Sequence, residues 1–287
     1  HNLMSKRKLS ELVERNFVKG WDDPRMPTIS GMKRRGYTPN SIKDFCSRIG
    51  ITKKNSFIEM GVLENTIREE LNISANRIMG VLDPIEINIT NYPENTAENI
   101  VAPYNPNTEN SKKRNISISK KVYIDRDDFM EHPDKKYFRL SPGKEVRLRH
   151  AFNIKCEKVI KDKNGNIVNL ECTYDPKSRD MKKGNKVKGM IHWVDANNCI
   201  DAQINIYDRL FKNSNPSSLD DFNDKSLKIK KNAKIENNLD VKDINARYQF
   251  ERVGYFFKDK NSTNENIIYN KIVSLKDSWK KINKKGD

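Results

Sequence analysis

Residues 151–174 read AFNIKCEKVIKDKNGNIVNLECTY, and this stretch indicates how most of the chain folds. Two runs, Ala151 to Ile160 and Ile167 to Tyr174, alternate apolar and polar residues with the period of a half-buried strand. Between them lies Lys163-Asn164-Gly165-Asn166. Because Asn and Gly tolerate a positive φ, Asn-Gly between alternating runs is the strongest short-range sign of a β-hairpin. The stretch therefore predicts two antiparallel strands.

The same alternation occurs on both sides of this hairpin. It begins at Asp83-Pro84, where Ile85, Ile87 and Ile89 alternate with polar residues. Further strands are predicted within 122–124, 146–149, 187–194, 202–207, 247–257 and 267–273. Short strands at regular spacing favour barrels. Two polar, turn-rich stretches, 102–116 and 213–243, are predicted to be connectors, and the second leads from one β-domain to another.

Residues 1 to about 83 have helical periodicity instead. One amphipathic segment runs from Lys8 to Phe17, with its apolar residues at helical spacing. After Pro24 and Pro27, Thr28 is a plausible N-cap for a second helix, and Gly36 suits its C-terminal end.

Two more helical stretches are predicted before the first strand. One opens at Pro39 and ends at Gly50, and its buried residues are expected to be Ile42, Phe45, Cys46 and Ile49. The other runs from Phe57 to Leu82, with an expected break near residues 72–74.

Charge points to a polyanionic partner. The 287 residues carry a formal net charge of +16, and their mean hydropathy is −0.87. Such a field attracts nucleic acid first and an anionic membrane second, although a lysine-rich codon bias gives the same composition. No apolar stretch approaches the ~20 residues that a spanning helix needs. Four cysteines without a C-x-x-C pair indicate reduced cytosolic thiols and no metal site.

Two runs near the start carry the sharpest motif. They are Leu3-Met4-Ser5-Lys6-Arg7-Lys8-Leu9 and Gly20-Trp21-Asp22-Asp23-Pro24-Arg25. The first resembles the ATP loop of class I aminoacyl-tRNA synthetases, the KMSKS signature, in a variant made of Met4, Ser5, Lys6 and Arg7. The resemblance implies that Lys6 is catalytic, because the second lysine of this loop neutralises ATP phosphate charge as the adenylate forms.

The resemblance to glutaminyl-tRNA synthetases of the bacterial type then extends in order along nearly the whole chain. The matching segments are Lys33–Thr38, Ile42–Cys46, Gly143–Arg149, Lys186–Val194, Tyr207–Phe211 and Tyr248–Phe256. It implies a mixed fold, α then all-β, with a helical connector followed by two anticodon-binding β-barrels. The expected domains are 1–83 for the end of the catalytic loop and the connector, 84–212 for the proximal barrel, and 213–287 for the distal barrel, with strands exchanged between the barrels.

The resemblance also implies which side chains bind the anticodon of tRNA. They are Asn72, Arg77, Asn107, Lys136, Arg139, Arg147, Arg149, Gln249 and Arg252. Phe138 stands where relatives often have lysine, and Lys136 where some have glutamine. The chemistry agrees, because unstacked bases expose Watson–Crick edges that Arg forks and Gln or Asn amides can read. A strand through Val146-Arg147-Leu148-Arg149 places both arginines on one face.

The function implied is tRNA recognition by the C-terminal portion of an enzyme that ligates glutamine to tRNA(Gln) with ATP and Mg²⁺. The open alternatives are a glutamyl-tRNA synthetase of the archaeal or eukaryotic type and a freestanding RNA-binding module. None of the four histidines lies in the His-x-Gly-His signature that class I catalysis needs, so we expect these residues alone to be inactive and to bind no cofactor tightly. We expect a cytoplasmic monomer whose partner is tRNA(Gln), without membrane, DNA or metal binding.

Overall fold

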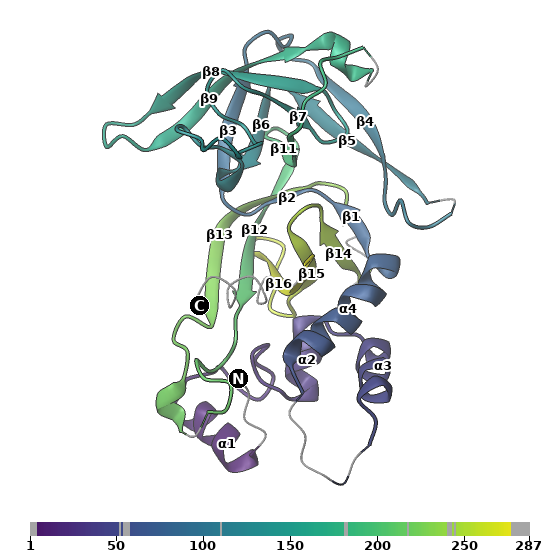
Figure 1. Ribbon diagram of the computed structural model, residues 1–287, viewed down its shortest axis with the longest axis vertical. Coiled ribbons are helices and arrows are strands. Elements are labelled where there is room, and N and C mark those ends of the chain that lie inside the picture. The colour runs from purple at the N-terminus through teal and green to yellow at the C-terminus, as the bar shows by residue number, and fades with distance from the viewer. Residues whose placement is uncertain are drawn as a thin grey trace. The chain divides into compact units, whose positions relative to one another are not determined.

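The computed structural model describes residues 5–51, 53, 58–109, 111–180, 183–216, 218–239, 243 and 245–276. The chain forms two compact units, each built from separate stretches of sequence. Unit 1 comprises residues 1–76, 203–231 and 241–287, and unit 2 comprises residues 77–202 and 232–240. Helices come first and strands follow, as Figure 1 shows, so the predicted order of α then all-β with two barrels is confirmed.

The described part of unit 1 contains four α-helices. They are α1 (Lys6–Glu14), α2 (Ile29–Arg35), α3 (Pro39–Ile49) and α4 (Met60–Ser74). Short 3₁₀ turns accompany the strands at η1 (Arg126–Asp128), η2 (Pro176–Arg179) and η3 (Leu219–Asp221). Within the described residues, every helix is too short or too polar to cross a membrane.

The predicted helix caps at α2 and α3 are confirmed. The side chain of Thr28 accepts a hydrogen bond from the backbone N–H of Gly31 at 3.0 Å, which satisfies one donor of the first turn. Gly36 ends α2 with φ +108°, and its N–H donates to the carbonyls of Lys33 and Met32. Thr38 and Gly50 play the same two roles for α3.

The break expected near residues 72–74 is confirmed, because helix α4 ends at Ser74. The helix expected beyond it to Leu82 is wrong, since β1 (Asn76–Ile78) and β2 (Gly80–Val81) take its place. Ile78, Met79 and Val81 are all fully buried, which a helix with one apolar face cannot achieve.

In α3, Cys46 is exposed and Ile49 is 36% exposed, although both were expected to be buried. Ile42 and Phe45 are partly buried, and they pack against Leu63 and Ile67 of α4 in one apolar cluster. Fewer apolar residues of α3 therefore face the core than the sequence pattern predicts.

Unit 2 is built on a seven-stranded sheet of order β10-β7-β8-β9-β3-β6-β11. Its strands are β3 (Pro84–Ile89), β6 (Lys121–Asp125), β7 (Glu145–Leu148), β8 (Asn153–Lys161), β9 (Ile167–Asp175), β10 (Met190–Ile191) and β11 (Trp193–Asp195). Ile85, Ile87 and Ile89 are buried as predicted, and Phe152 and Trp193 are the largest side chains of the core.

The predicted hairpin is present as β8 and β9, paired antiparallel with Cys156 opposite Cys172. Its turn is longer than a two-residue Asn-Gly turn. The carboxylate of Asp162 accepts hydrogen bonds from the backbone N–H groups of Asn164 at 2.9 Å and Asn166 at 2.8 Å. Gly165 supplies the positive φ of +81° that lets the chain reverse.

Strands also occur where connectors were predicted. Part of 102–116 belongs to a two-stranded antiparallel ribbon, β4 (Ala97–Pro103) and β5 (Lys113–Ser119). The stretch 213–243 contains β13 (Leu227–Glu236), whose exposed lysines hide its alternation in the sequence.

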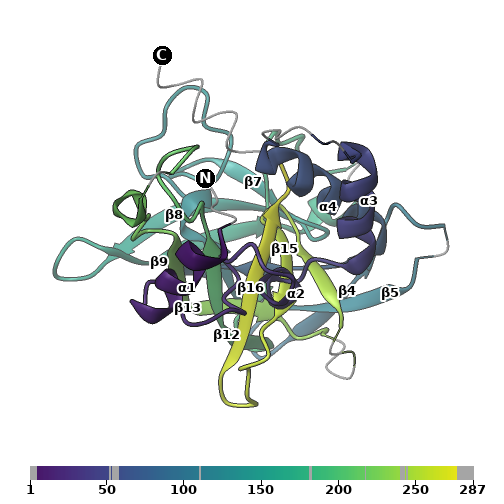
Figure 2. The ribbon, with the colours of Figure 1, turned by 90° about the horizontal axis from the view of Figure 1, so that it is seen from below.

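In unit 1 the strands follow the order β14-β15-β16-β12-β13, as part of a seven-stranded sheet. Its remaining strands are β12 (Cys199–Tyr207), β14 (Arg247–Phe250), β15 (Gly254–Lys258) and β16 (Ile267–Ser274). Phe250 and Phe256 stack with their ring centroids 4.1 Å apart inside it. In Figure 2, α2 lies beside β16, and the Arg35 Nε donates to the carbonyl of Ile272 at 3.2 Å.

Gly36 is the position where this packing is least tolerant. A Cβ added there would lie 2.5 Å from the Cβ of Phe257, on a backbone already at φ +108°. We expect Gly36→Ala to lower the free energy of unfolding by more than about 2 kcal/mol, from strain and overpacking together. Gly165→Ala is the control, since this glycine also has a positive φ, +81°, but a Cβ there meets nothing within 4 Å, and it should cost about 1 kcal/mol. Urea denaturation compares them, and equal losses would contradict the packing argument.

Candidate nucleic-acid interface

Three segments of unit 2 meet beside strand β7. Strand β10 pairs with β7 in parallel, so the backbone N–H of Arg147 donates to the carbonyl of Gly189 at 2.9 Å. The loop before β7 passes so close to Gly189 that an added Cβ there would lie 1.9 Å from the carbonyl oxygen of Phe138. Only glycine permits this approach, and it brings residues 138, 149, 188 and 190 onto one surface.

This surface, which we call the aromatic–cation patch, consists of Phe138, Arg139, Arg149, Lys188 and Met190. Phe138 is 53% exposed and Met190 is 38% exposed. The Lys188 Nζ lies 5.2 Å from the ring centroid of Phe138, and the Arg149 Nη1 lies 3.3 Å from the Met190 Sδ. The patch therefore combines an accessible ring and thioether with cations.

Arg139 projects from the loop beside Phe138. Its guanidinium Nη1 donates to the backbone carbonyl of Asp127 at 2.8 Å and lies 3.3 Å from the Asp128 Oδ1. The side chain stays 45% exposed, so one edge of the fork is anchored while much of it faces solvent. This geometry suits recognition of a phosphate or a base edge.

Arg147 uses its guanidinium differently. Its Nη1 donates to the Ser178 carbonyl at 2.8 Å and to the Asn153 Oδ1 at 3.3 Å, and its Nη2 donates to the Ala151 carbonyl at 2.9 Å. Burial lowers the pKa of this arginine from its ordinary value. The side chain thus holds the start of β8 and η2 in place, and its anticodon role stays a prediction.

The other predicted residues of unit 2 lie outside the patch or at its margin. Lys136 is exposed in the loop that leads to Phe138. Arg77 is half-buried in β1, where its backbone N–H donates to the carbonyl of Tyr104 at 2.6 Å. Asn107 is exposed in a turn, and its N–H donates to the Asn105 Oδ1 at 3.0 Å.

The predicted residues of unit 1 occupy several different settings. Ser5, Lys6 and Arg7 are exposed at the start of α1, whereas Met4 lies outside the described residues. Asn72 is exposed near the end of α4. Gln249 is only 7% exposed, and its amide donates to the Tyr255 hydroxyl at 2.8 Å, so it is a structural amide in this conformation.

Arg252, also in unit 1, forms the turn between β14 and β15. It has φ +69°, an uncommon conformation for a residue with a Cβ. The backbone N–H of Val253 closes the turn by donating to the carbonyl of Phe250 at 2.9 Å.

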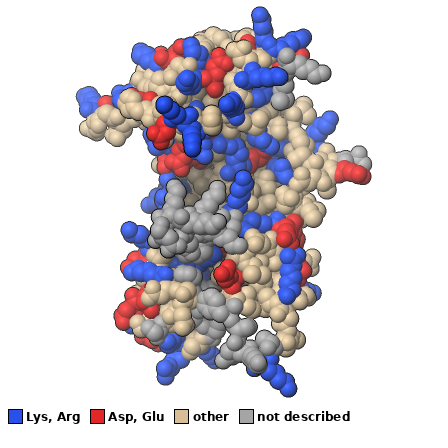
Figure 3. All heavy atoms as spheres, viewed as in Figure 1, with Lys and Arg blue, Asp and Glu red and all other residues tan. Residues whose placement is uncertain are grey.

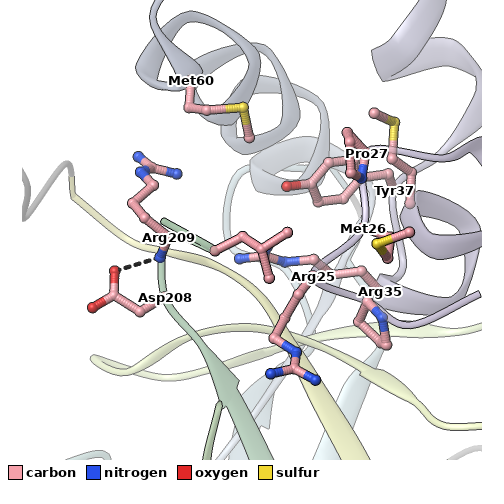
Figure 4. A pocket seen from close by; sticks show the side chains of 11 residues that line it. Arg25, Met26, Pro27, Arg35, Tyr37, Met60, Asp208 and Arg209 are labelled. Atoms are coloured by element: carbon pink, nitrogen blue, oxygen red, sulfur yellow. Dashed lines mark hydrogen bonds between the residues drawn. The ribbon is translucent and has the colours of Figure 1, made fainter. Parts of the chain in front are cut away.

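Unit 1 also contains a pocket, shown in Figure 4, that encloses about 410 Å³ including space open to solvent. Arg25, Arg35 and Arg209 line it beside Met26, Tyr37 and Met60. Asp23 pairs with Arg25 at 2.8 Å and Glu64 pairs with Arg209 at 2.6 Å, so carboxylates neutralise both cations. Two of the three lining arginines are therefore paired with carboxylates, which weakens the pocket as an anion site.

Basic side chains are not confined to the patch. Figure 3 shows Lys and Arg spread over the visible face of the molecule, with Asp and Glu among them. Such a distribution provides general attraction for a polyanion but no sequence selectivity. Selectivity requires side chains held in defined positions, and the residues of the aromatic–cation patch are the candidates for that role.

Sequence reasoning did not select Lys188 and Met190. The available signal was Gly189 between them, because an isolated glycine in a strand pattern often marks a close backbone approach. Asp128 and His192, which contact each other beneath Arg139, gave no local signal.

Comparison with known proteins divides the chain into three matched regions. Residues 1–73 match the family described as tRNA synthetases class I (E and Q), catalytic domain. Residues 75–175 and 190–259 match two families, both described as tRNA synthetases class I (E and Q), anti-codon binding domain. The aromatic–cation patch draws on both anticodon-binding matches, since Met190 begins the second.

The chain is also similar to complete proteins from several bacteria. It is 49% identical to a glutamine–tRNA ligase of Proteus mirabilis over 292 residues, which covers 100% of this chain and 52% of that protein. A glutamine–tRNA ligase of Clostridium perfringens is 48% identical over 288 residues, with 98% and 52% covered. The chain therefore spans about half the length of these relatives.

The contacts of Arg147 lead to a stability prediction. A lysine cannot reach the three acceptors that the guanidinium bridges, so Arg147→Lys leaves buried carbonyls unpaired. We expect it to lower the free energy of unfolding by roughly 1–3 kcal/mol. Arg149→Lys, two residues along the same chain segment, should cost less than about 0.5 kcal/mol. Denaturant titration of both variants tests this, and an unchanged stability for Arg147→Lys would mean that its bridging contacts contribute nothing.

Proposed function

The chain belongs to the class I tRNA synthetases for glutamate and glutamine, as the C-terminal portion of a glutamine–tRNA ligase, and we propose that it binds tRNA(Gln) and reads its anticodon. The aromatic–cation patch is the observation that supports this proposal most directly. An exposed ring offers a stacking surface for an unpaired base, and the neighbouring cations attract the phosphates that accompany it.

In the complete enzyme this portion would act with a nucleotide-binding domain that these 287 residues do not contain. Ser5, Lys6 and Arg7, together with Met4, would form the loop against ATP, and Lys6 would offset charge on the phosphates as glutamine is activated. The complete enzyme would use ATP with Mg²⁺ to join glutamine to tRNA(Gln). The residues of this chain alone would activate no amino acid.

The sequence left two alternatives open, a glutamyl-tRNA synthetase and a freestanding RNA-binding module. The glutamine–tRNA ligases above are similar across 98–100% of this chain, which favours glutamine over glutamate as the amino acid of the complete enzyme. A freestanding RNA-binding module would have no use for residues 1–73, which match a catalytic domain. Glutamine–tRNA ligase therefore remains the proposal.

Direct titration tests the proposed function. We expect the purified chain to bind tRNA(Gln) with an affinity that falls steeply as salt rises, because its cations release counterions from the phosphates. We also expect tRNA(Gln) to bind more tightly than the same tRNA with single anticodon bases replaced. Arg139→Gln should reduce that preference by roughly 1–3 kcal/mol, a magnitude taken from base readout in DNA. Equal binding of all these tRNAs would refute anticodon reading and leave only general RNA affinity.

Phe138 provides a second test, specific to stacking. Phe138→Leu keeps an apolar side chain of similar size but removes the ring, so it should weaken tRNA(Gln) binding by roughly 1–3 kcal/mol, or about 5- to 150-fold. Val168→Ala removes exposed apolar surface from β9 in the same unit and serves as the matched control. Replacing an anticodon base with a fluorescent purine gives a direct readout, since stacking on Phe138 quenches it. Equal affinity of the Leu variant and the wild-type chain would exclude a stacking role.

A further inference from the structure

A buried carboxylate lies directly beneath the exposed Arg139. The Asp128 side chain is only 3% exposed, and its Oδ1 lies 3.3 Å from the Nη1 of Arg139. The same guanidinium nitrogen donates to the carbonyl of Asp127 at 2.8 Å. Turn η1 contains both aspartates. It therefore binds one edge of the Arg139 guanidinium and leaves the rest accessible.

Asp128 is itself held by a buried histidine. Its second oxygen, Oδ2, lies 3.4 Å from the Nδ1 of His192, a side chain that is 5% exposed. On the far side of the ring, the Nε2 of His192 lies 3.7 Å from the Oδ2 of Asp125. That carboxylate in turn accepts the backbone N–H of Leu82 at 3.0 Å. Asp128 and His192 thus lie between Asp125 and Arg139, and the Nε2 of His192 faces Asp125 without a hydrogen bond of its own.

The strand pairing fixes where each of these residues lies. Asp125 ends β6, Asp128 follows in η1, and His192 stands between β10 and β11. Trp193 pairs with Ile124 across the β11–β6 ladder, so His192 cannot shift along the strand without breaking the register. The imidazole also separates the buried carboxylate of Asp128 from the partly buried carboxylate of Asp125, and these would otherwise repel each other at close range.

We propose that Asp128 and His192 are positioning residues for Arg139, and that they hold its guanidinium ready to contact RNA. The inference rests on the proposed function and adds residues to it that do not touch the RNA. An arginine that is already oriented loses less side-chain freedom on binding than a mobile one. Removing the support should therefore weaken RNA binding even though Arg139 itself is unchanged.

Two replacements of His192 form a matched pair. In His192→Asn, the amide nitrogen lies near the position of Nδ1 and can still donate to Asp128. In His192→Gln, the amide nitrogen lies near the position of Nε2, so it reaches toward Asp125 instead. Both variants place a neutral amide in the same buried site, and they differ mainly in which carboxylate they support.

Affinity for tRNA(Gln) is measured in these variants of the full chain, alone and combined with Arg139→Gln. We expect His192→Gln to weaken binding by about 2- to 12-fold, the cost of immobilising one long side chain, and His192→Asn to weaken it much less. In the Arg139→Gln background neither replacement should weaken binding further, because the residue through which they act is gone. Asp128→Asn should weaken binding as His192→Gln does. It provides an independent test if a histidine variant fails to fold.

An RNA-free measurement separates this inference from the proposed function. The Nε–H group of Arg139 is followed by nitrogen relaxation in the isotopically labelled chain, and we expect it to be ordered in the wild type and in His192→Asn but mobile in His192→Gln. If tRNA(Gln) does not bind at all, the proposed function fails. The relaxation measurement still tests whether Asp128 and His192 hold Arg139 in place. The inference is overturned if Arg139 is equally ordered in all three proteins. It is also overturned if the loss in affinity is the same with and without Arg139, since that indicates a general structural effect.

Discussion

Unit 2 depends on one fully buried ion pair. The Nε of Arg114 on β5 lies 2.6 Å from the Oε1 of Glu236 at the end of β13, and the two side chains are 0% and 3% exposed. Glu236 also accepts the backbone N–H of Met79 at 2.9 Å and the Asn238 amide at 2.9 Å. Because the desolvation of two charges is repaid only when every polar atom has a partner, this geometry is strict. It secures residues 232–240 in a unit otherwise formed by residues 77–202.

The candidate interface likewise depends on one close contact, at Gly189. One glycine allows the 188–190 segment to lie against the loop before β7, and that single approach assembles an exposed ring, a thioether and several cations. The arginines near this segment differ in their hydrogen-bond partners. Arg147 is occupied with protein carbonyls, whereas Arg139 is anchored on one edge and open on the other. Neighbouring residues of the same type can therefore differ in what they are able to bind.

The basic residues of this chain can contribute to RNA binding in two different ways. A net charge of +16 supplies long-range attraction that any RNA would share. Discrimination depends on the few side chains whose orientation is fixed before the ligand arrives. Arg139, which lies 3.3 Å from Asp128, is the candidate for such a side chain.

The sequence by itself determined most of the element types, several of their boundaries and the family. Alternation at Ile85, Ile87 and Ile89 gave a strand, and Thr28 and Gly36 marked a helix, because these signals act over a few neighbouring residues. Local patterns were weaker where tertiary contacts compete with them. The stretch after Ser74 became strand because its backbone groups pair with distant segments, and β13 was hidden by lysines on its exposed positions.

Only the tertiary structure decided which candidate side chains are available. Gln249 donates to Tyr255 inside unit 1, and Arg147 spans to Ser178, 31 positions away in the sequence. Asp128 and His192 lie 64 positions apart and yet meet beneath Arg139. No periodicity or motif encodes such partners, because a side chain's accessibility and orientation depend on whichever residues the completed fold brings to it. The sequence specified the chemistry of each group, and the packing decided whether that chemistry faces the protein or the solvent.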